Sequence, residues 1–352
     1  MSPDQGAKRQ ELFQFSFPEV VGTPTATEEH YQWKFHHFPQ KPNSYEFVCL
    51  EKNTAENIML GYYAAIPYRY SLAGKAMICG MVCDVMTHPA ARGKGIFTKL
   101  GIFSTAELKA RGLDFVSGYP IRPEVIPGHL KAGWMIGFKE PMWIRVIKLN
   151  SLLHGKPIEF LAPVLNFLAA TFSFLVNLGR SSAEVSFLTR EEFLKDQSYD
   201  AFFRDWKNSQ KICLEKSKDF LAWRTNAPGT LYEFVKISLA GKMVALALTT
   251  QRKLKGVPSV AILDIMILPE HLNQSRALHL AIFKRAKAQH AQAVVSMISK
   301  YWAKKYRFYR NGFIPTPAVF SIIFKIFNEA LPKSLFSDQT NWHLMWIDSD
   351  DL

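Results

Sequence analysis

The sequence is poor in cysteine. Its 352 residues include only four, and none lies in a Cys-x-x-Cys pair or in a Cys/His cluster with metal-ligand spacing. The sequence therefore gives no basis for a zinc site or a disulfide framework. His36 and His37 are adjacent and point to different faces, so we expect no metal site from them. The first fifteen residues lack the apolar core of a secretory signal peptide, and we expect a cytoplasmic protein.

The common nucleotide-binding signatures are missing as well. The P-loop pattern GxxxxGK[ST] does not occur in the chain. Gly93-Lys94-Gly95 lacks the third glycine of GxGxxG, because Ile96, Phe97 and Thr98 follow it. Neither of these two phosphate-binding motifs therefore accounts for the glycine-rich segment.

Acidic residues are scarce in one part of the chain. Between residues 201 and 310 there are 20 Lys and Arg but only 6 Asp and Glu, so this stretch accounts for the whole net charge of +13. Positive charge of this density favours phosphates, anionic lipid or other anionic partners. No recognised nucleic-acid motif accompanies it, and we expect no nucleic-acid partner.

The chain contains a faint internal repeat. Short matches recur in the same order at nearly equal spacing, which is typical of two copies of one domain. We predict a first domain over residues 1–150, an apolar linker helix over 151–185 and a second domain over 186–352. The matching segments are Trp33-Lys34 and Trp223-Arg224, Tyr45–Val48 and Tyr232–Val235, Cys83–Pro89 and Leu263–Pro269, Asp114–Pro120 and Ala293–Ser299, and His129–Trp134 and Phe308–Phe313.

Strand and helix patterns alternate within the first copy. Apolar runs rich in β-branched and aromatic residues predict strands, and an apolar face of helical period predicts a helix from Ile96 to Gly112. A shorter helix is expected to end at Gly133. These patterns predict an α/β fold class, with helices and a mixed sheet (α+β). The predicted strands cover residues 44–52, 58–68, 75–88, 113–120 and 135–147.

The loop Arg92-Gly93-Lys94-Gly95 lies between a predicted strand and a predicted helix. Free backbone N–H groups and the helix dipole make the start of a helix an anion site. Gly93 and Gly95 carry no Cβ and let a ligand approach the backbone. Arg92 and Lys94 add positive charge. The alternative to an anion-binding loop is an ordinary surface turn that binds no ligand.

The segment His88–Leu100 resembles the acyl-CoA loop of the Gcn5-related N-acetyltransferases (GNAT), whose motif is Arg/Gln-x-x-Gly-x-Gly/Ala. Arg92, Gly95 and Phe97 fall on its three marked positions, and Phe97 departs from the small residue expected there. The resemblance extends over residues 44–147 and, in degenerate form, over 232–316. It implies two tandem GNAT-like acyl-CoA N-acyltransferase domains joined by an apolar helix.

The resemblance also implies how an acyl-CoA would be held. Acetyl-CoA, or another acyl-CoA, would be the co-substrate, and no metal is required. The strand before the loop would hold the pantetheine and the thioester carbonyl, and the loop would hold the pyrophosphate. The implied cofactor-binding residues are Val85, Met86, Thr87, Arg92, Gly93, Lys94, Gly95, Ile96, Phe97 and Ser117.

Two residues are candidates for proton transfer. Asp84 lies where family members often place an acidic base, although Asp264 repeats it in the second copy and favours a structural role. His129 occupies the position of a tyrosine that protonates the leaving thiolate in the family, and imidazole can donate a proton near neutral pH. A packed histidine is the alternative.

The second copy lacks the glycine loop. Without gaps, residues 92–97 align with Leu272-Asn273-Gln274-Ser275-Arg276-Ala277, which contain no glycine. If the glycines served only the fold, both copies would need them. We therefore expect the first copy alone to bind acyl-CoA, and the second to be a degenerate partner.

The segment Pro157–Gly179 is apolar and raises three possibilities: a transmembrane helix, a helix packed between the domains, and an interfacial helix. Its polar residues form one narrow stripe, and we expect the packed form. A membrane surface is a possible partner but not the favoured one. The stripe consists of Glu159, Asn166, Ser173 and Asn177.

The predicted function is transfer of an acetyl or other acyl group from acyl-CoA to an amine. The acceptor would be a small molecule or a carbohydrate- or lipid-linked amine, and the basic second half favours an anionic one. The alternative function is a non-catalytic acyl-CoA-binding or membrane-surface scaffold.

Overall fold

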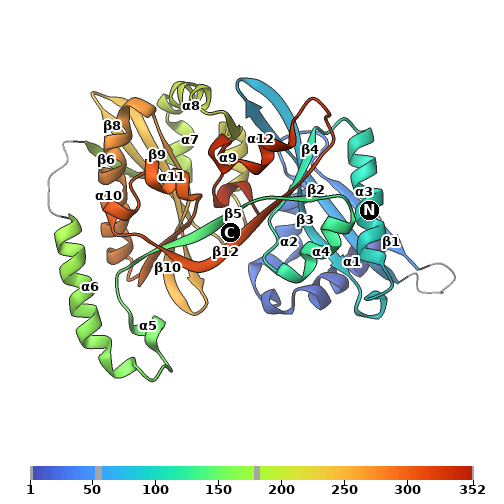
Figure 1. Ribbon diagram of the computed structural model, residues 1–352, viewed down its shortest axis with the longest axis horizontal. Coiled ribbons are helices and arrows are strands. Elements are labelled where there is room, and N and C mark those ends of the chain that lie inside the picture. Colours follow the sequence, from blue (N-terminus) through green and yellow to red (C-terminus); the bar gives the residue numbers. More distant parts are fainter. Residues whose placement is uncertain (1–2, 52–57, 178–182, 351–352) are drawn as a thin grey trace. The chain divides into compact units, whose positions relative to one another are not determined.

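The computed structural model describes residues 3–51, 58–177 and 183–350, which fall into two compact units (Figure 1). Unit 1 comprises residues 1–138, 214–229 and 321–341, and unit 2 comprises 139–213, 230–320 and 342–352. Both units are mixed α/β structures, as the sequence predicts. Neither is contiguous in sequence, whereas the predicted domains 1–150 and 186–352 are.

Unit 1 is built around a mixed sheet. β1 (Tyr45–Leu50), β2 (Met59–Leu72) and β3 (Lys75–Thr87) are antiparallel neighbours, and β4 (Phe115–Gly118) is parallel to β3. Its helices are α1 (Pro3–Ser16), α2 (Glu28–His36), α3 (Ile96–Ala110), α4 (Ile126–Lys131), α9 (Lys218–Arg224) and α12 (Lys333–Ser337). Each strand and helix predicted for the first copy is present.

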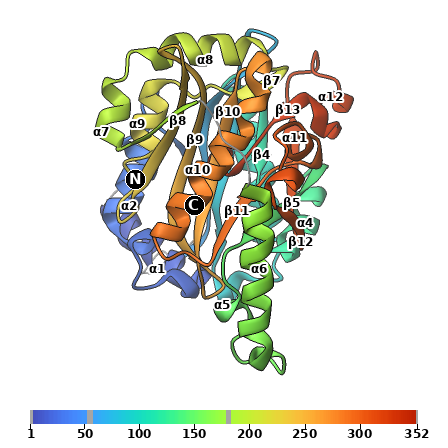
Figure 2. The ribbon, with the colours of Figure 1, turned by 90° about the vertical axis from the view of Figure 1, so that its left-hand side faces the viewer.

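Unit 2 repeats this strand order. β6 (Glu184–Leu188), β8 (Tyr232–Leu239), β9 (Lys242–Leu254) and β10 (Val257–Ile267) are antiparallel neighbours, and β11 (Ala293–Met297) is parallel to β10. Figure 2 shows α10 crossing these strands. The remaining elements are α5 (Asn150–Leu153), α6 (Ala162–Asn177), α7 (Arg190–Lys195), α8 (Ser198–Asn208), β7 (Ile212–Leu214), α10 (Ser275–Ala288), α11 (Lys300–Lys305) and β13 (Trp342–His343).

The last strand of each copy joins the sheet of the other unit. In unit 1, the outer neighbour of β4 is the end of β12 (Ile314–Ile326), with Gly118 opposite Ile323. In unit 2, the outer neighbour of β11 is the end of β5 (Met135–Val146), with Val295 opposite Ile144. Both pairings are antiparallel. The units are therefore completed by reciprocal exchange of one strand.

Trp33 and Trp223, which occupy matching positions of the repeat, are buried together in unit 1. Their rings stack with centroids 5.1 Å apart. Each indole N–H donates to the other residue's carbonyl oxygen, at 2.7 and 2.8 Å. This reciprocal contact is what two copies of one sequence motif produce around a local two-fold relation, and it supports the repeat.

The apolar segment forms the turn Glu159–Leu161 followed by α6, and residues 178 and 179 lie outside the described residues. Its apolar side chains are exposed on unit 2. Phe160, Phe167 and Phe172 are 76, 71 and 53% exposed. Among the described residues, no helix is long and apolar enough to cross a membrane.

Candidate functional site

A β-bulge interrupts β3 where the sequence places Asp84. The pairing with β2 runs from Tyr62 opposite Met86 to Ala64 opposite Cys83, so Asp84 and Val85 together face Tyr63. Asp84 has a φ of 48°, in the left-handed region that Asp tolerates better than most residues. A bulge disrupts the ladder and bends its strand, and bulges are frequent beside active sites.

The other edge of β3 is open over the same residues. Its parallel pairing with β4 ends at Val82 opposite Gly118, where β4 itself ends. No strand pairing is described on that side for residues 84–87. The predicted ligand-holding residues Val85, Met86 and Thr87 all lie on this open edge. Ser117 lies inside the sheet instead, buried, and accepts a weak bond from the Cys79 thiol at 3.3 Å.

The glycine loop continues directly from β3. After the turn Pro89–Ala91, Gly93 and Gly95 both take a φ of 76°, which glycine adopts without strain. Gly95 is the N-cap of α3, and no side chain caps the helix. The first N–H groups of α3, from Ile96, thus face the exposed loop. Arg92 and Lys94 are exposed beside them.

Phe97 does not crowd this loop, because its ring turns toward α4. A Cβ on Gly128 would lie 2.6 Å from the ring, so only glycine leaves room for it. The ring also meets His129 edge-on, with centroids 5.0 Å apart. The sequence marked Phe97 as a departure from the small residue of the motif, and Gly128 compensates for it.

His129 is buried between Phe97 and Trp134. Burial lowers its pKa to about 4, so the imidazole is neutral at neutral pH. A neutral imidazole is a poor proton donor compared with an imidazolium. These surroundings favour a packing role over the predicted acid role, which stays a prediction.

Asp84 is paired with Lys34 of α2. The Lys34 ammonium lies 2.9 Å from an Asp84 carboxylate oxygen, and the two side chains are only 8 and 13% exposed. Both residues line a small cavity together with Arg9, His30 and Tyr31. Asp84, the residue predicted as a base, thus forms an ion pair with Lys34 at the bulge. The sequence contained Lys34 in its repeated Trp-basic pair, but the pairing with Asp84 could not be read from it.

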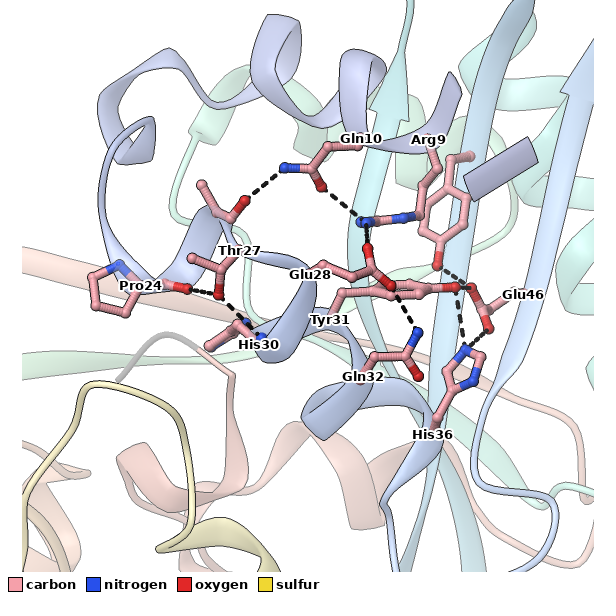
Figure 3. A network of polar contacts seen from close by, with 12 residues as sticks. Arg9, Gln10, Pro24, Thr27, Glu28, His30, Tyr31, Gln32, His36 and Glu46 are labelled. Atoms are coloured by element: carbon pink, nitrogen blue, oxygen red, sulfur yellow. Dashed lines mark hydrogen bonds and ion pairs between the residues drawn. The ribbon is translucent and has the colours of Figure 1, made fainter. Parts of the chain in front are cut away.

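A polar network between α1, α2 and the sheet lies next to this pair (Figure 3). Tyr31 and Tyr62 each donate a hydrogen bond of 2.6 Å to Glu46, and burial raises the pKa of both phenols above their ordinary value. The Arg9 guanidinium lies over the Tyr31 ring, 3.6 Å from its centroid. Sequence reasoning missed this network, since its members are far apart along the chain.

Unit 2 keeps the bulge and loses the loop. β10 has one extra residue, Leu263, between the pairs formed by Ile262 and Asp264. The turn Pro269–Gln274 then runs helically into α10, and Gln274 at its N-cap has a φ of −72°. The N-terminus of α10 is therefore preceded by helical backbone, and no exposed glycine loop stands before it. The loop predicted for one copy is present in that copy alone.

No metal site is found among the residues that the structure describes. The adjacent histidines are not brought together by the fold. His36 lies 3.4 Å from a Glu46 oxygen and 3.2 Å from the Tyr31 hydroxyl, and so belongs to the network of Figure 3.

Residues 21–136 match the family model described as acetyltransferase (GNAT) domain. The match contains the bulge of β3, the glycine loop, α3 and α4. It ends before the second copy begins. A comparison with curated protein sequences finds no match.

Solved structures resemble nearly the whole chain. A GCN5-related N-acetyltransferase from Anabaena variabilis is 13% identical with a TM-score of 0.65, and the match covers 93% of this chain and 72% of that one. An Enterococcus faecalis protein described as a probable N-acyltransferase is 10% identical (TM-score 0.61; 93 and 72%). Saccharomyces cerevisiae N-myristoyltransferase, solved with bound myristoyl-CoA, is 11% identical (TM-score 0.59; 92 and 80%). At these identities the likeness shows a shared fold alone.

Proposed function

This chain carries a GNAT acetyltransferase domain in residues 21–136, and we propose that this domain transfers an acyl group from acyl-CoA to an amine. The observation that carries the proposal is the continuity of three features in unit 1: the bulge at Asp84-Val85, the open edge of residues 84–87 and the exposed loop before α3. Together these features would offer backbone groups first to the thioester and pantetheine of acyl-CoA and then to its pyrophosphate, along one strand and one helix.

The loop would bind the pyrophosphate through the N–H groups at the start of α3, aided by the charges of Arg92 and Lys94. The open edge of β3 would hold the pantetheine through backbone groups near Val85 and Thr87. Binding by these backbone groups requires no titratable side chain. Recognition of acyl-CoA would then depend on the backbone conformation, which the two glycines of the loop make possible.

The chemistry needs no covalent enzyme intermediate. The neutral amine attacks the thioester carbon, the C–S bond breaks, the thiolate takes up a proton and the amine gives one up. Donors aimed at the carbonyl oxygen would stabilise the developing charge. Asp84, at the bulge, is a candidate to accept the proton that the amine gives up. Its carboxylate is paired with Lys34, and both residues line the small cavity.

We propose an anionic, carbohydrate-like or lipid-linked amine as the acceptor. The support is electrostatic: residues 201–310 carry 20 Lys and Arg against 6 Asp and Glu. A cationic acceptor would be repelled by this charge, whereas an anionic one would be attracted.

A second function keeps acyl-CoA binding without transfer. The burial of His129 favours it, because a buried neutral imidazole is a poor proton donor for the leaving thiolate. Release of free thiol from acetyl-CoA with a panel of amines separates the two. Amine-dependent thiol release supports transfer, and binding with no release above the enzyme-free rate supports the scaffold.

Calorimetry with CoA tests the site itself. We expect one site per chain, and Gly95→Glu should weaken binding at least about a hundredfold, since it places negative charge beside the phosphates. Gly74→Glu is the matched control, because Gly74 also has a positive φ and open surroundings and lies in the β2–β3 turn. Two equal sites per chain, or equal losses in both variants, would contradict the proposal.

A further inference from the structure

The exposed face of α6 and of the turn before it is continuous and apolar. Its side chains recur at the spacing of one helical face, and all of them are more than half exposed. On most surface helices such a face lies against the core. The residues are Phe160, Val164, Phe167, Leu168 and Phe172, with exposures of 76, 58, 71, 56 and 53%.

The polar side of the helix faces the protein instead. Asn166 accepts a hydrogen bond of 2.7 Å from the Leu149 N–H and donates one of 2.6 Å to the Asn150 side chain. These bonds fix the rotation of α6 about its axis, so the apolar face is held outward. The helix lies beside α10, whose Arg276 reaches the Val176 carbonyl oxygen at 3.3 Å (Figures 1 and 2).

Cationic side chains border this apolar face. Lys156 is exposed just before its N-terminal end, and Arg276 lies at its C-terminal end. Arg310 is exposed on the turn Tyr309–Asn311, which packs against α6. The nearby Glu159 carboxylate is already bonded to His154, at 3.0 Å, and to the Gly155 N–H. Unit 2 as a whole has 24 Lys and Arg against 14 Asp and Glu.

We propose that this face of α6 binds the surface of an anionic lipid membrane. Phenylalanine side chains would enter the boundary between headgroups and acyl chains, and the bordering cations would meet anionic headgroups. The 16 residues of α6 that the structure describes are too few to span a bilayer, and they suit an orientation parallel to its surface. The proposal does not depend on the proposed acyl transfer.

A second copy of the chain suits this face less well. A symmetric dimer built on α6 would bring Lys156, Arg276 and Arg310 toward the same residues of the partner, and like charges oppose association. The face is also one helix wide, whereas a stable interface buries more than about 1,000 Å² in total.

Vesicle co-sedimentation of the full chain tests the proposal. With vesicles of phosphatidylcholine containing phosphatidylserine, we expect pelleting that weakens as salt rises. The double variant Phe160→Glu/Phe167→Glu should lower the partition coefficient at least about tenfold. Lys156→Ala and Arg310→Ala should each lower it about fivefold.

Leu231→Glu is the matched control, because Leu231 is 89% exposed and lies outside α5, α6 and the Tyr309–Asn311 turn. It should pellet like the unchanged protein, and equal melting temperatures would show that all variants fold. Absence of pelleting with anionic vesicles, or equal pelleting of the double variant, overturns the proposal. A concentration-dependent dimer that the double variant abolishes would identify a second copy as the occupant and overturn it too.

Discussion

At the scale of single residues, the ion pair of Lys34 and Asp84 joins two parts of the site that the sequence separates by 50 positions. Its charges are largely removed from water, so each depends on the other. Asp84 also occupies a backbone conformation that asparagine tolerates equally. Structural and catalytic roles of this carboxylate can therefore be separated by substitution.

Asp84→Asn should lower the free energy of unfolding by about 2 kcal/mol, because it removes the carboxylate charge that is paired with the buried Lys34 ammonium. Urea unfolding measures this loss, and adding Lys34→Met should recover part of it. If Asp84 serves mainly the fold, turnover per folded enzyme falls less than about tenfold. A stable Asp84→Asn protein with turnover reduced more than about a hundredfold would instead identify Asp84 as the base.

Glu140 carries a fully buried carboxyl group, and neither of its oxygens has a hydrogen-bond partner among the described residues. Burial, and then the nearby Asp348, raise its pKa well above the ordinary value. The folded chain therefore keeps a proton at Glu140 that the unfolded chain loses first.

The stability of the protein should therefore fall as the pH rises from the unfolded pKa toward the folded one, by at most about 1.4 kcal/mol per pH unit from this group. Glu140→Gln removes the titration. The variant should match the unchanged protein near pH 4 and be more stable at pH 7, as measured by unfolding at a series of pH values. Parallel stability curves for the two proteins would show that Glu140 does not titrate in this way.

At the scale of elements, α4 fixes how α3 begins. The Phe97 ring lies against the Gly128 backbone, and this contact keeps the ring away from the exposed loop. The first turn of α3 thus depends on a glycine that lies about 30 residues further along the chain, on another helix.

Gly128→Ala should push the Phe97 ring by placing a Cβ 2.6 Å from it, at a cost of about 1–3 kcal/mol in stability and with weaker CoA binding. Adding Phe97→Leu should restore both. Gly101→Ala on α3 is the control, since its Cβ would make only ordinary contacts at 3.8 Å or more. Melting curves and CoA calorimetry report the outcome. A harmless Gly128→Ala would mean that the contact does not position α3.

At the scale of the whole molecule, neither copy supplies all the strands of its unit. The end of β12 covers the edge of β4, and Ile323 packs against the Gly118 backbone. Lys325 of this strand donates hydrogen bonds to the Thr105 hydroxyl at 2.8 Å and to the Ala132 carbonyl oxygen at 2.7 Å. Unit 1 therefore takes part of its core from residues more than 170 positions beyond the first copy.

A fragment of residues 1–150 should not fold as a stable monomer, because it exposes the β4 edge and the apolar surface that Ile323 and Phe327 cover. We expect it to aggregate or to melt without a cooperative transition, by gel filtration and circular dichroism. Coexpression with residues 186–352 should recover a soluble complex. A monomeric fragment that melts cooperatively and binds CoA like the full chain would contradict a required strand exchange.

The sequence by itself determined the elements of the first copy and the loop between β3 and α3. These depend on periodicity, glycine conformation and helix ends, which act within a few residues of the chain. The presence of the loop in one copy only and the recurrence of the tryptophans could also be recognised from the sequence. The tertiary structure alone decided the Lys34–Asp84 pair, the turn of Phe97 toward Gly128 and the exchange of β5 and β12. It also decided that α6 exposes its apolar face, since the bonds of Asn166 to Leu149 and Asn150 set its rotation. Each of these outcomes depends on contacts between residues distant in sequence, where local patterns carry no information.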